Sequence, residues 1–506
     1  MRKKLSGFVL GAILLHFGFG ALAQGYVESA LLFSRTKPGG SARIQGAGGA
    51  QIALGGDFSS ALSNPAGIGM YNRSEISLTP GYSTYNARSL YLGSRNEGDK
   101  TGLNIPGLGF VFHMPAQKGS YLGGSFALTF SRTNDFNGEI LYNGVNENTS
   151  IIDYFIDDAA FGTTAQFEEG ARHYNTPTGL AYFNYLIGPQ TLLDPPGPDD
   201  EYFSDIRSIP FQQEEIRTRG ASNQWSISYG GNYNDMIFFG GGIGITTLRY
   251  KSEKLFTEDF DDDPFLRNLA LQENLDIRGT GINATLGVIV RPVNFLQVGA
   301  SVTTPTYYQL SETYSADMTT SWKNFDYYGD GSVVLNDEHA GTDLVTSDYT
   351  LTMPFKFSTG IAFISKHGYI AADAEFVNPS RTKYGSETMG VSYTPENEAI
   401  RATYKPVTNL RIGGEFRYEI FRVRAGYAIQ GNTFSDDVDL DNQINTISAG
   451  VGVRTSRYFI DLAWVQSSSD EVYNPYTFAV YPDFQTPQVD LKNKFTQVML
   501  TLGVTF

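Results

Sequence analysis

The sequence predicts an all-β fold, a closed antiparallel transmembrane barrel of fourteen strands with an N-terminal plug in its lumen. Many short segments carry apolar side chains at every second position, which is the period of a strand. The spacers between them alternate between short and long, as in outer-membrane barrels. The composition, with 55 glycines, 31 tyrosines, 35 phenylalanines and only 18% charged residues, suits a sheet with aromatic girdles.

The first residues have the pattern of a secretory signal peptide, which we expect to span residues 1–23. A basic start at 2–4 precedes an apolar run from 5 to about 19, and a small-residue cleavage site follows at 21–23. The alternative is an uncleaved membrane anchor, but the apolar run is short and no charged stop follows it. The mature chain is therefore predicted to begin at Gln24.

Charge and cysteine content narrow the class of protein. The chain has no cysteine, so it is neither a lipoprotein nor a disulfide-stapled secreted domain. A formal net charge of −16 makes it a poor partner for nucleic acid. No linker rich in Pro, Ser or Gly divides the chain, which predicts one large unit.

The strands begin beyond residue 74. In the first, Ile76, Leu78 and Tyr82 share one face, while glutamate, serine and threonine occupy the other. The same alternation predicts fourteen strands, at 75–83, 104–114, 121–132, 224–233, 237–250, 282–290, 296–302, 349–364, 369–377, 410–418, 421–429, 447–453, 458–466 and 495–506.

Six of the spacers are short and seven are long. This alternation puts both ends of the barrel in the periplasm and the long loops outside the cell. A soluble sandwich is the alternative, but its buried face would not so often oppose Arg and Glu. The last strand ends at Phe506, which we interpret as the signal for the barrel-insertion machinery; any edge strand would also alternate. The long spacers are 84–103, 133–223, 251–279, 304–348, 378–408, 431–444 and 467–493.

Residues 41–71 are too rich in glycine and alanine to form a core of their own, so we expect them to fit inside another structure. Within them, Asn64, Pro65 and Ala66 predict a turn, because proline fixes φ and removes a donor.

The ordered set of signal peptide, glycine-rich segment, Asn-Pro-Ala-Gly and barrel resembles the FadL/TodX family of outer-membrane channels for long-chain fatty acids and other hydrophobic compounds. The resemblance implies a hatch at 24–72 inside a barrel at 73–506, in the outer membrane of a Gram-negative bacterium. It also implies passive uptake of a hydrophobic small molecule, with Arg43, Asn64, Pro65 and Ala66 as the residues that hold and gate the hatch. The alternative for the last three is a structural turn without ligand contact.

Members of this family release ligand sideways, through a gap made by a kink in the third strand. Here that strand contains Gly123 and Gly124 but no proline, which permits a kink without indicating one. If the wall is continuous, the alternative function is a barrel that anchors or shuttles secreted proteins at the outer membrane.

Two groups of residues are candidates for ligand contact. In the longest spacer, Tyr182, Phe183, Tyr185 and Leu186 form an apolar run that could capture a hydrophobic ligand or pack within a loop subdomain, and the two interpretations are compatible. Basic residues on the predicted lumenal faces either receive a ligand carboxylate or, as paired wall charges, stiffen the barrel. These are Arg411, Arg417, Arg422 and Arg424.

Evidence for cofactors and catalysis is slight. Asp326, Asp330 and Asp337 match positions 1, 5 and 12 of a calcium loop, but Tyr328 stands where Asp or Asn is expected. Ca²⁺ is the one cofactor considered, and we expect no enzyme activity, because the histidines lack metal-ligand spacing and no GxSxG occurs. A Ser–His pair assembled across strands is the alternative.

We expect a monomer that contacts the bilayer and lipopolysaccharide. The acidic outer loops are either solvated or bridged to lipopolysaccharide by divalent ions.

Overall fold

The computed structural model describes residues 20–116, 119–160, 163–189, 201–438, 440–480 and 484–506. It confirms the closed antiparallel barrel of fourteen strands. Three wall strands are each interrupted once, giving the pairs β3/β4, β10/β11 and β13/β14. The wall consists of β1 (Glu75–Tyr91), β2 (Ser94–Pro115), β3 (Tyr121–Asp135), β4 (Gly138–Val145), β7 (Phe211–Tyr233), β8 (Ile237–Asp259), β9 (Leu266–Val293), β10 (Leu296–Thr303), β11 (Tyr307–Asp326), β13 (Val345–Thr352), β14 (Lys356–Ser365), β15 (Gly368–Val377), β17 (Val407–Tyr418), β18 (Phe421–Gln430), β19 (Ile444–Arg454), β20 (Tyr458–Tyr473) and β21 (Val489–Thr505).

The first and last strands close the wall. Ile76 lies opposite Val504, and the pairing continues along β1 and β21. Ser74 and Phe506 exchange two backbone hydrogen bonds, of 3.1 and 3.0 Å, at the end of this ladder. Every wall strand is thereby bonded on both sides over part of its length, which a backbone in lipid requires.

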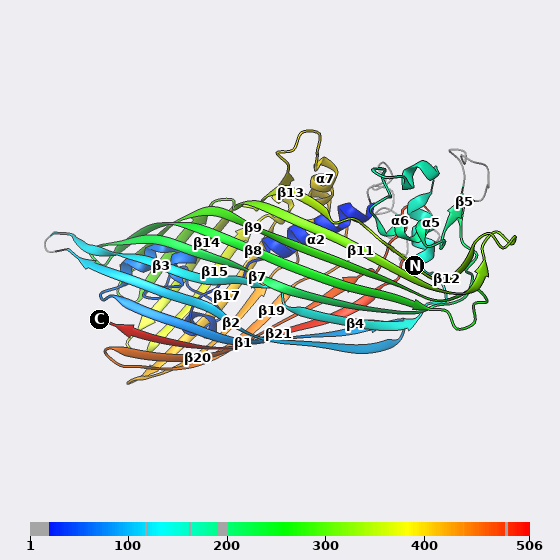
Figure 1. Cartoon of the computed structure of the whole chain (residues 1–506). Coiled ribbons are helices and arrows are strands. Elements are labelled where there is room, and N and C mark those ends of the chain that lie inside the picture. The colour runs from blue at the N-terminus through cyan, green and yellow to red at the C-terminus, as the bar shows by residue number, and fades with distance from the viewer. Residues whose placement is uncertain (1–19, 117–118, 161–162, 190–200, 439, 481–483) are drawn as a thin grey trace, which may run out of the picture.

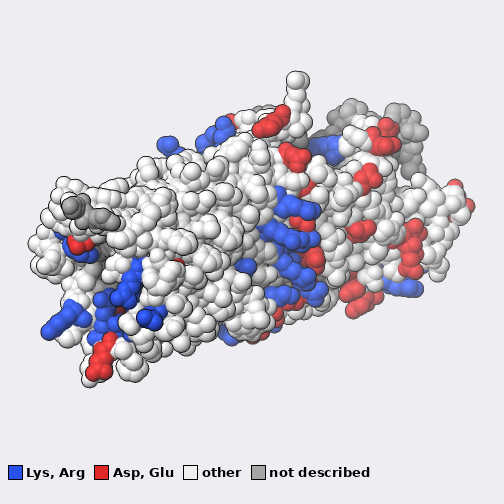
Figure 2. All heavy atoms as spheres, turned by 60° about the vertical axis from the view of Figure 1, so that its left-hand side comes forward, with Lys and Arg blue, Asp and Glu red and all other residues white. Residues whose placement is uncertain are grey.

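The outer face of the barrel carries an apolar belt. Trp225, Ile245 and Ile282 lie side by side on β7, β8 and β9 and are 39%, 49% and 54% exposed. Gln224 and Ser226, which flank Trp225 in the chain, point inward and are buried. Figure 2 shows a broad uncharged zone between two groups of charged residues. Apolar outside and polar inside is the arrangement of a barrel that sits in a bilayer.

The predicted strands are too short at the outer end. The expected spacers 84–103 and 251–279 are mostly strand: β1 and β2 turn at Leu92 and Gly93, and β8 and β9 at 260–265. The alternation fades there because both faces are polar. Lys251 points outward to Asp276, at 2.8 Å, while Lys254 points inward to Tyr473. Beyond the bilayer no face has to be apolar, so the period of two disappears although the strand continues.

Short elements cover the outer end of the barrel. Helices α5 and α6 share one apolar cluster with residues of β8, β9 and β11. Glu258 accepts hydrogen bonds from Ile151 N at 2.8 Å and Ser150 Oγ at 2.5 Å, so part of the acidic run 258–263 is buried structure, not a solvated surface. The elements of this end are α5 (Ile151–Ala159), η2 (Thr164–Phe167), α6 (Pro177–Phe183), β5 (Gly188–Pro189), β6 (Tyr202–Phe203), β12 (Val334–Gly341), η3 (Pro379–Arg381), β16 (Lys383–Gly385) and α7 (Thr394–Thr403).

The N-terminal segment lies within the barrel (Figure 1). It contains α2 (Gly20–Ser34), α3 (Ala42–Gly46), α4 (Ser60–Ser63) and η1 (Pro65–Met70). Residues 1–19 of the predicted signal peptide lie outside the described residues. No helix in the described ranges combines the length and the apolar composition needed to cross a membrane.

Candidate functional site

The hatch fits the wall backbone to backbone. A Cβ added at Gly413 would lie 1.9 Å from Ala47 O, and one at Gly240 would lie 2.3 Å from the carbonyl carbon of Pro65. A Cβ at Gly426 would meet the backbone nitrogen of Gly48 at 2.1 Å. Any side chain at these wall positions would push the hatch away, so glycine is required for close approach.

Asn64 joins the hatch to the wall. Its Nδ2 donates to Ile52 O at 2.7 Å and to Val288 O on β9 at 3.3 Å. Its Oδ1 accepts from Ala66 N at 3.2 Å, which caps η1 as that element begins at Pro65. Asn64, Pro65 and Ala66, the three residues predicted to form this turn, are all buried, and they hold the turn against the wall.

Arg43 is buried between the hatch and the wall. Its Nη1 donates to Gly56 O at 2.8 Å, and its guanidinium lies 3.9 Å from Asp57 and 3.9 Å from Glu415 on β17. The α3 cap also involves Asp57, which accepts from Ser41 Oγ at 2.7 Å. The charge of Arg43 therefore bridges two parts of the hatch and the barrel interior.

A second link, which the sequence did not indicate as a hatch contact, is Asp373 on β15. One carboxylate oxygen accepts hydrogen bonds from the backbone N–H groups of Gln51 and Ile52, at 2.6 and 2.9 Å. Asp373 is buried between small residues of the wall. The sequence signal for this link was an acidic residue within the apolar run 370–377. Its partners, the N–H groups of Gln51 and Ile52, could not be inferred from sequence.

Three of the four predicted lumenal arginines pair with carboxylates. Arg411 lies 3.1 Å from Glu375, and Arg417 lies 2.6 Å from Glu415. Arg424 bridges Glu415 and Asp461, both at 2.6 Å. Arg422 donates instead to the carbonyls of Glu419 and Phe421. The interior surface next to the hatch is therefore a network of matched charges.

Above the hatch, α2 fills an apolar space in the lumen. Val27, Ala30 and Phe33 are buried against inward-facing wall residues and α7. Tyr26 contacts the rings of three tyrosines, with centroid distances of 5.1 to 5.7 Å. These partners are Tyr349, Tyr384 and Tyr393. This helix was not predicted; its first residues, 20–23, fall in the predicted signal peptide.

The wall is interrupted beside the hatch. Strand β2 pairs with β3 only from Gly107 to Pro115, and in the described residues no backbone ladder joins its outer part, 94–106, to β3 or β4. After a break at 136–137, β4 crosses the inner side of β1, where Ser89 Oγ donates to Leu141 O at 2.6 Å. The third strand is therefore broken at 136–137, further along than Gly123 and Gly124, where the structure has a shift in register between Tyr121 and Gly123.

Side chains of β2 and β3 border this interruption, together with the segment 35–41 that links α2 to α3. Asn104 Nδ2 donates to Asp135 Oδ2 at 3.3 Å, and Arg132 lies 2.9 Å from the same carboxylate. Lys37 N donates to Thr133 O at 2.8 Å. On the outside, Leu103 is 87% exposed. In place of a ladder, a few polar contacts close the wall here, together with β4, which packs behind the outer parts of β1 and β2, where Asn96 Nδ2 donates to Asn143 Oδ1 at 3.3 Å.

The predicted capture residues lie in the loop domain, which we define as α5, η2, α6, β5 and β6 with the apolar cluster they form at the outer end of β8, β9 and β11. Leu186 is buried, Tyr182 stacks on Phe167 with a centroid distance of 4.2 Å, and Tyr185 contacts Tyr327. Phe183 is 40% exposed. The run therefore packs mainly within the loop domain and presents one aromatic ring to solvent.

The proposed calcium ligands do not come together. Residues 326–337 form the β11–β12 hairpin, in which Asp326 accepts from Gly329 N and Gly331 N, and Asp337 accepts from Ser321 Oγ. Asp330 accepts from Ser332 N. Within the described ranges, no group of three acidic or histidine side chains is placed to hold a metal.

A Ser–His pair across strands is present: His113 Nδ1 lies 3.1 Å from Ser125 Oγ. Ser125 is fully buried, and no carboxylate of the described residues bonds to His113 in this structure. The pair lacks both an accessible nucleophile and a third group to orient the histidine.

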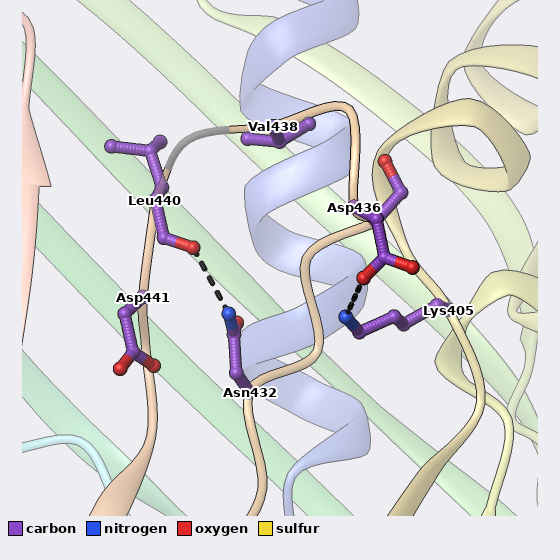
Figure 3. Close-up of a pocket in the computed structure, with 7 residues that line it drawn as sticks. Lys405, Asn432, Asp436, Val438, Leu440 and Asp441 are labelled. Carbon is purple, nitrogen blue, oxygen red and sulfur yellow. Dashed lines mark hydrogen bonds and ion pairs between the residues drawn. The ribbon is translucent and has the colours of Figure 1, made fainter.

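A pocket of about 420 Å³ lies at the outer loop 431–443, beside α2 (Figure 3). Lys405 and Asp436 form an ion pair on its rim, and Asn432 Nδ2 donates to Leu440 O at 3.0 Å. The lining is mostly polar, so this pocket does not suit a hydrophobic ligand.

Comparison of sequences finds no protein-family model and no curated protein that matches the chain. Comparison of structures finds a FadL homologue and toluene transporters. A Pseudomonas aeruginosa FadL homologue has a TM-score of 0.55 and 13% identity, over 94% of this chain and 99% of that one. The toluene transporters TodX of P. putida and TbuX of Ralstonia pickettii each have a TM-score of 0.50, with 12% and 13% identity, over 93% of this chain and 99% of theirs. At these identities the likeness shows the fold. The chain has the fold of the FadL/TodX channels, as the resemblance predicted, and its apolar belt is that of a barrel in a bilayer.

Proposed function

We propose that this barrel is a passive uptake channel for hydrophobic small molecules, which leave the lumen sideways through the interruption between β2 and β3. The observation that carries the proposal is that interruption: the β2–β3 ladder stops at Gly107, inside the apolar belt. A hydrophobic molecule gains nothing from a water-filled exit, whereas an exit into lipid keeps its apolar surface away from water.

The level of the break supports an exit into the bilayer. Leu103 lies opposite Tyr82 on β1, whose ring is 47% exposed in the aromatic girdle. Leu103 and Ile105 present apolar side chains, 87% and 49% exposed, along the free part of β2. A molecule passing between β2 and β3 would therefore meet an apolar edge at the outer rim of the apolar belt, next to the lipid chains.

The position of α2 supports coupling between ligand and exit. Asn134 on β3 donates to Leu32 O and Arg35 O at the end of α2, at 3.2 and 3.1 Å. Phe33 contacts Phe136 at the break, with a centroid distance of 5.7 Å. A ligand that displaces α2 from its apolar space would loosen the contacts that border the exit.

The lumenal charges favour a neutral ligand or a neutral ligand segment. Arg411 and Arg424 are already bonded to wall carboxylates, so neither offers a free cation to a ligand carboxylate. Burial of apolar surface, at about 25 cal/mol per Å², would supply the binding free energy. Monoaromatic hydrocarbons are thus the first class to test, and long-chain fatty acids are the second.

The proposal is tested by uptake of labelled toluene and labelled oleate into cells that carry or lack the protein. We expect uptake of at least one compound to fall on deletion and to return with the gene. Unchanged uptake of both would contradict transport of these classes. The alternative, a barrel that anchors secreted proteins, predicts unchanged uptake together with loss of surface proteins; the interrupted wall favours transport over it.

A further inference from the structure

A group of exposed basic residues lies on the outer face of β7, β8 and β9, just beyond the apolar belt. We define the basic patch as Arg219, Arg249, Lys251 and Arg278. Strand register brings them together: Arg249 lies opposite Arg278, and Lys251 opposite Arg219. All four point away from the lumen, with the parity of the lipid-facing residues on the same strands. Figure 2 shows a band of Lys and Arg beside the broad uncharged zone.

Within its own two rows the patch has four cations and one carboxylate. In the next row outward, Glu253 lies opposite Arg217, which pairs with Glu139 and Glu215. Asp276 lies 2.8 Å from Lys251 and 3.9 Å from Arg278. It is the single carboxylate that faces outward in the two rows of paired residues, Ala221–Arg249–Arg278 and Arg219–Lys251–Asp276. Arg219 and Arg249 have no ionic or hydrogen-bonding side-chain partner among the described residues. Like charges on neighbouring strands repel one another, so an anion from outside the chain would stabilise the patch.

The patch lies at the level of the lipid headgroups. Trp225, Ile245 and Ile282 form the outermost apolar row on these strands, and Arg249 follows Ile245 by four residues. Four residues span about 13 Å along a strand, or about 10 Å along the membrane normal at the usual tilt. Arginine side chains are long enough to reach the phosphates from there.

The patch is on the outer leaflet side, because it faces the long loops and lies away from the chain ends and short turns. Its cations spread over three neighbouring strands, a width of about 10 Å. That width suits a headgroup with phosphates on two linked sugars better than a single phosphodiester. We propose that the basic patch binds the phosphorylated disaccharide headgroup of an outer-leaflet glycolipid, as in lipopolysaccharide.

The partner is thus a lipid that surrounds the barrel, not the transported molecule. Arg219 and Arg249 are the cations free to bond phosphate, each through a fork of N–H donors. Lys251 and Arg278 would share their charge between Asp276 and the lipid. The contact would fix the height of the barrel in the membrane and cover β7 to β9 with one oriented lipid.

The test uses the full-length mature barrel, purified in detergent and stripped of lipid. Binding of bisphosphorylated lipid A, dephosphorylated lipid A and phosphatidylglycerol is measured by native mass spectrometry and calorimetry. The Arg219→Gln/Arg249→Gln variant is compared with Arg267→Gln/Arg401→Gln, which removes two exposed arginines elsewhere. Heat-modifiable gel mobility verifies that each variant is folded.

We expect bisphosphorylated lipid A to bind at least tenfold more weakly to the patch variant than to wild type, and equally well to the control variant. Dephosphorylated lipid A should bind wild type at least tenfold more weakly, and 0.5 M salt should weaken the phosphate-dependent part. Equal affinity of wild type and the patch variant would overturn the proposal. Phosphatidylglycerol binding as tightly as lipid A would overturn the assignment to the glycolipid.

Discussion

Asp373 shows how a single wall residue can hold the hatch. It is buried, and one of its oxygens accepts the N–H groups of both Gln51 and Ile52. Hydrogen bonds to a charged group contribute about 1.5–3 kcal/mol each. Asn64, which the sequence resemblance did identify, makes a neutral bond to Val288 O of 3.3 Å. Composition therefore predicted the segment that forms the hatch, but the carboxylate that accepts two of its N–H groups comes from a strand far away in sequence.

Asp373→Ala should release this side of the hatch, because two backbone donors lose a charged acceptor. We expect a loss of about 3 kcal/mol from hatch docking, seen as more frequent channel openings in planar bilayers and faster proteolysis within 41–71. Asp348→Ala, which removes an exposed carboxylate on β13, is the matched control. Identical opening frequencies in the two variants would contradict the role of Asp373.

We expect His173 to make the stability of the loop domain depend on pH. Burial lowers its pKa below the ordinary value, although Asp158, at 3.5 Å, acts in the opposite direction. The unfolded loop therefore binds the proton more readily, so the stability of the loop domain is full above about pH 6.5 and falls as the pH drops below it.

We expect the loop domain to be cleaved several-fold faster by protease at pH 5 than at pH 8. His173→Phe should remove most of that difference, because phenylalanine has no proton to bind. His339→Gln changes a histidine with a 61% exposed side chain and should leave the difference intact. A pH effect of the same size in His173→Phe would assign the sensitivity to other groups.

At the scale of elements, the sequence predicted strands well only where they cross the bilayer. There the lipid imposes an apolar face, as at Ile243 and Ile245, and the period of two is clear. The outer extension of β8 and β9 was missed, because Lys251 and Lys254 face opposite sides and neither side is apolar. The break at 136–137 was missed for another reason: it is set by the crossing of β4 over β1, a contact between distant segments.

Helix α2 should act as a plug for the apolar space above the hatch. Val27→Ala/Phe33→Ala removes two buried side chains, and truncating a buried phenylalanine alone costs about 3–5 kcal/mol. We expect the helix to undock, with higher basal uptake of hydrophobic compounds and greater sensitivity of cells to large apolar antibiotics. Ser29→Ala on the same helix is the control. Unchanged uptake would show that α2 does not limit passage.

At the scale of the whole molecule, the apolar belt sets the position of the barrel in the bilayer. On β7 the belt runs from Trp225 to Tyr233, about 27 Å along the strand and roughly 20 Å across the membrane after tilt. Leu286, on β9, lies near the middle of this belt and is 65% exposed. Thr247 lies in the first polar row beyond it.

Leu286→Arg should therefore destabilise the barrel in a bilayer by about 2–4 kcal/mol, because the charge would lie near the midplane. Thr247→Arg, at the rim, should cost about 0–1 kcal/mol. Reversible unfolding in lipid vesicles measures both. If the two variants are equally stable, the depth assigned to the belt is wrong.

The central claim is lateral release through the interruption between β2 and β3, and covalent closure of that interruption tests it most directly. The chain has no cysteine, so Asn104→Cys/Asp135→Cys can be joined by a short reducible cross-linker without side reactions. Phe112→Cys/Phe126→Cys joins the same two strands where they are already paired, and serves as the control.

The uptake of whichever hydrophobic compound the wild-type channel carries is then measured before cross-linking, after it, and after reduction. The account predicts that the cross-link at 104 and 135 abolishes uptake, that reduction restores it, and that the control cross-link has no effect. Full uptake through the closed Asn104→Cys/Asp135→Cys barrel would contradict lateral release and place the exit elsewhere.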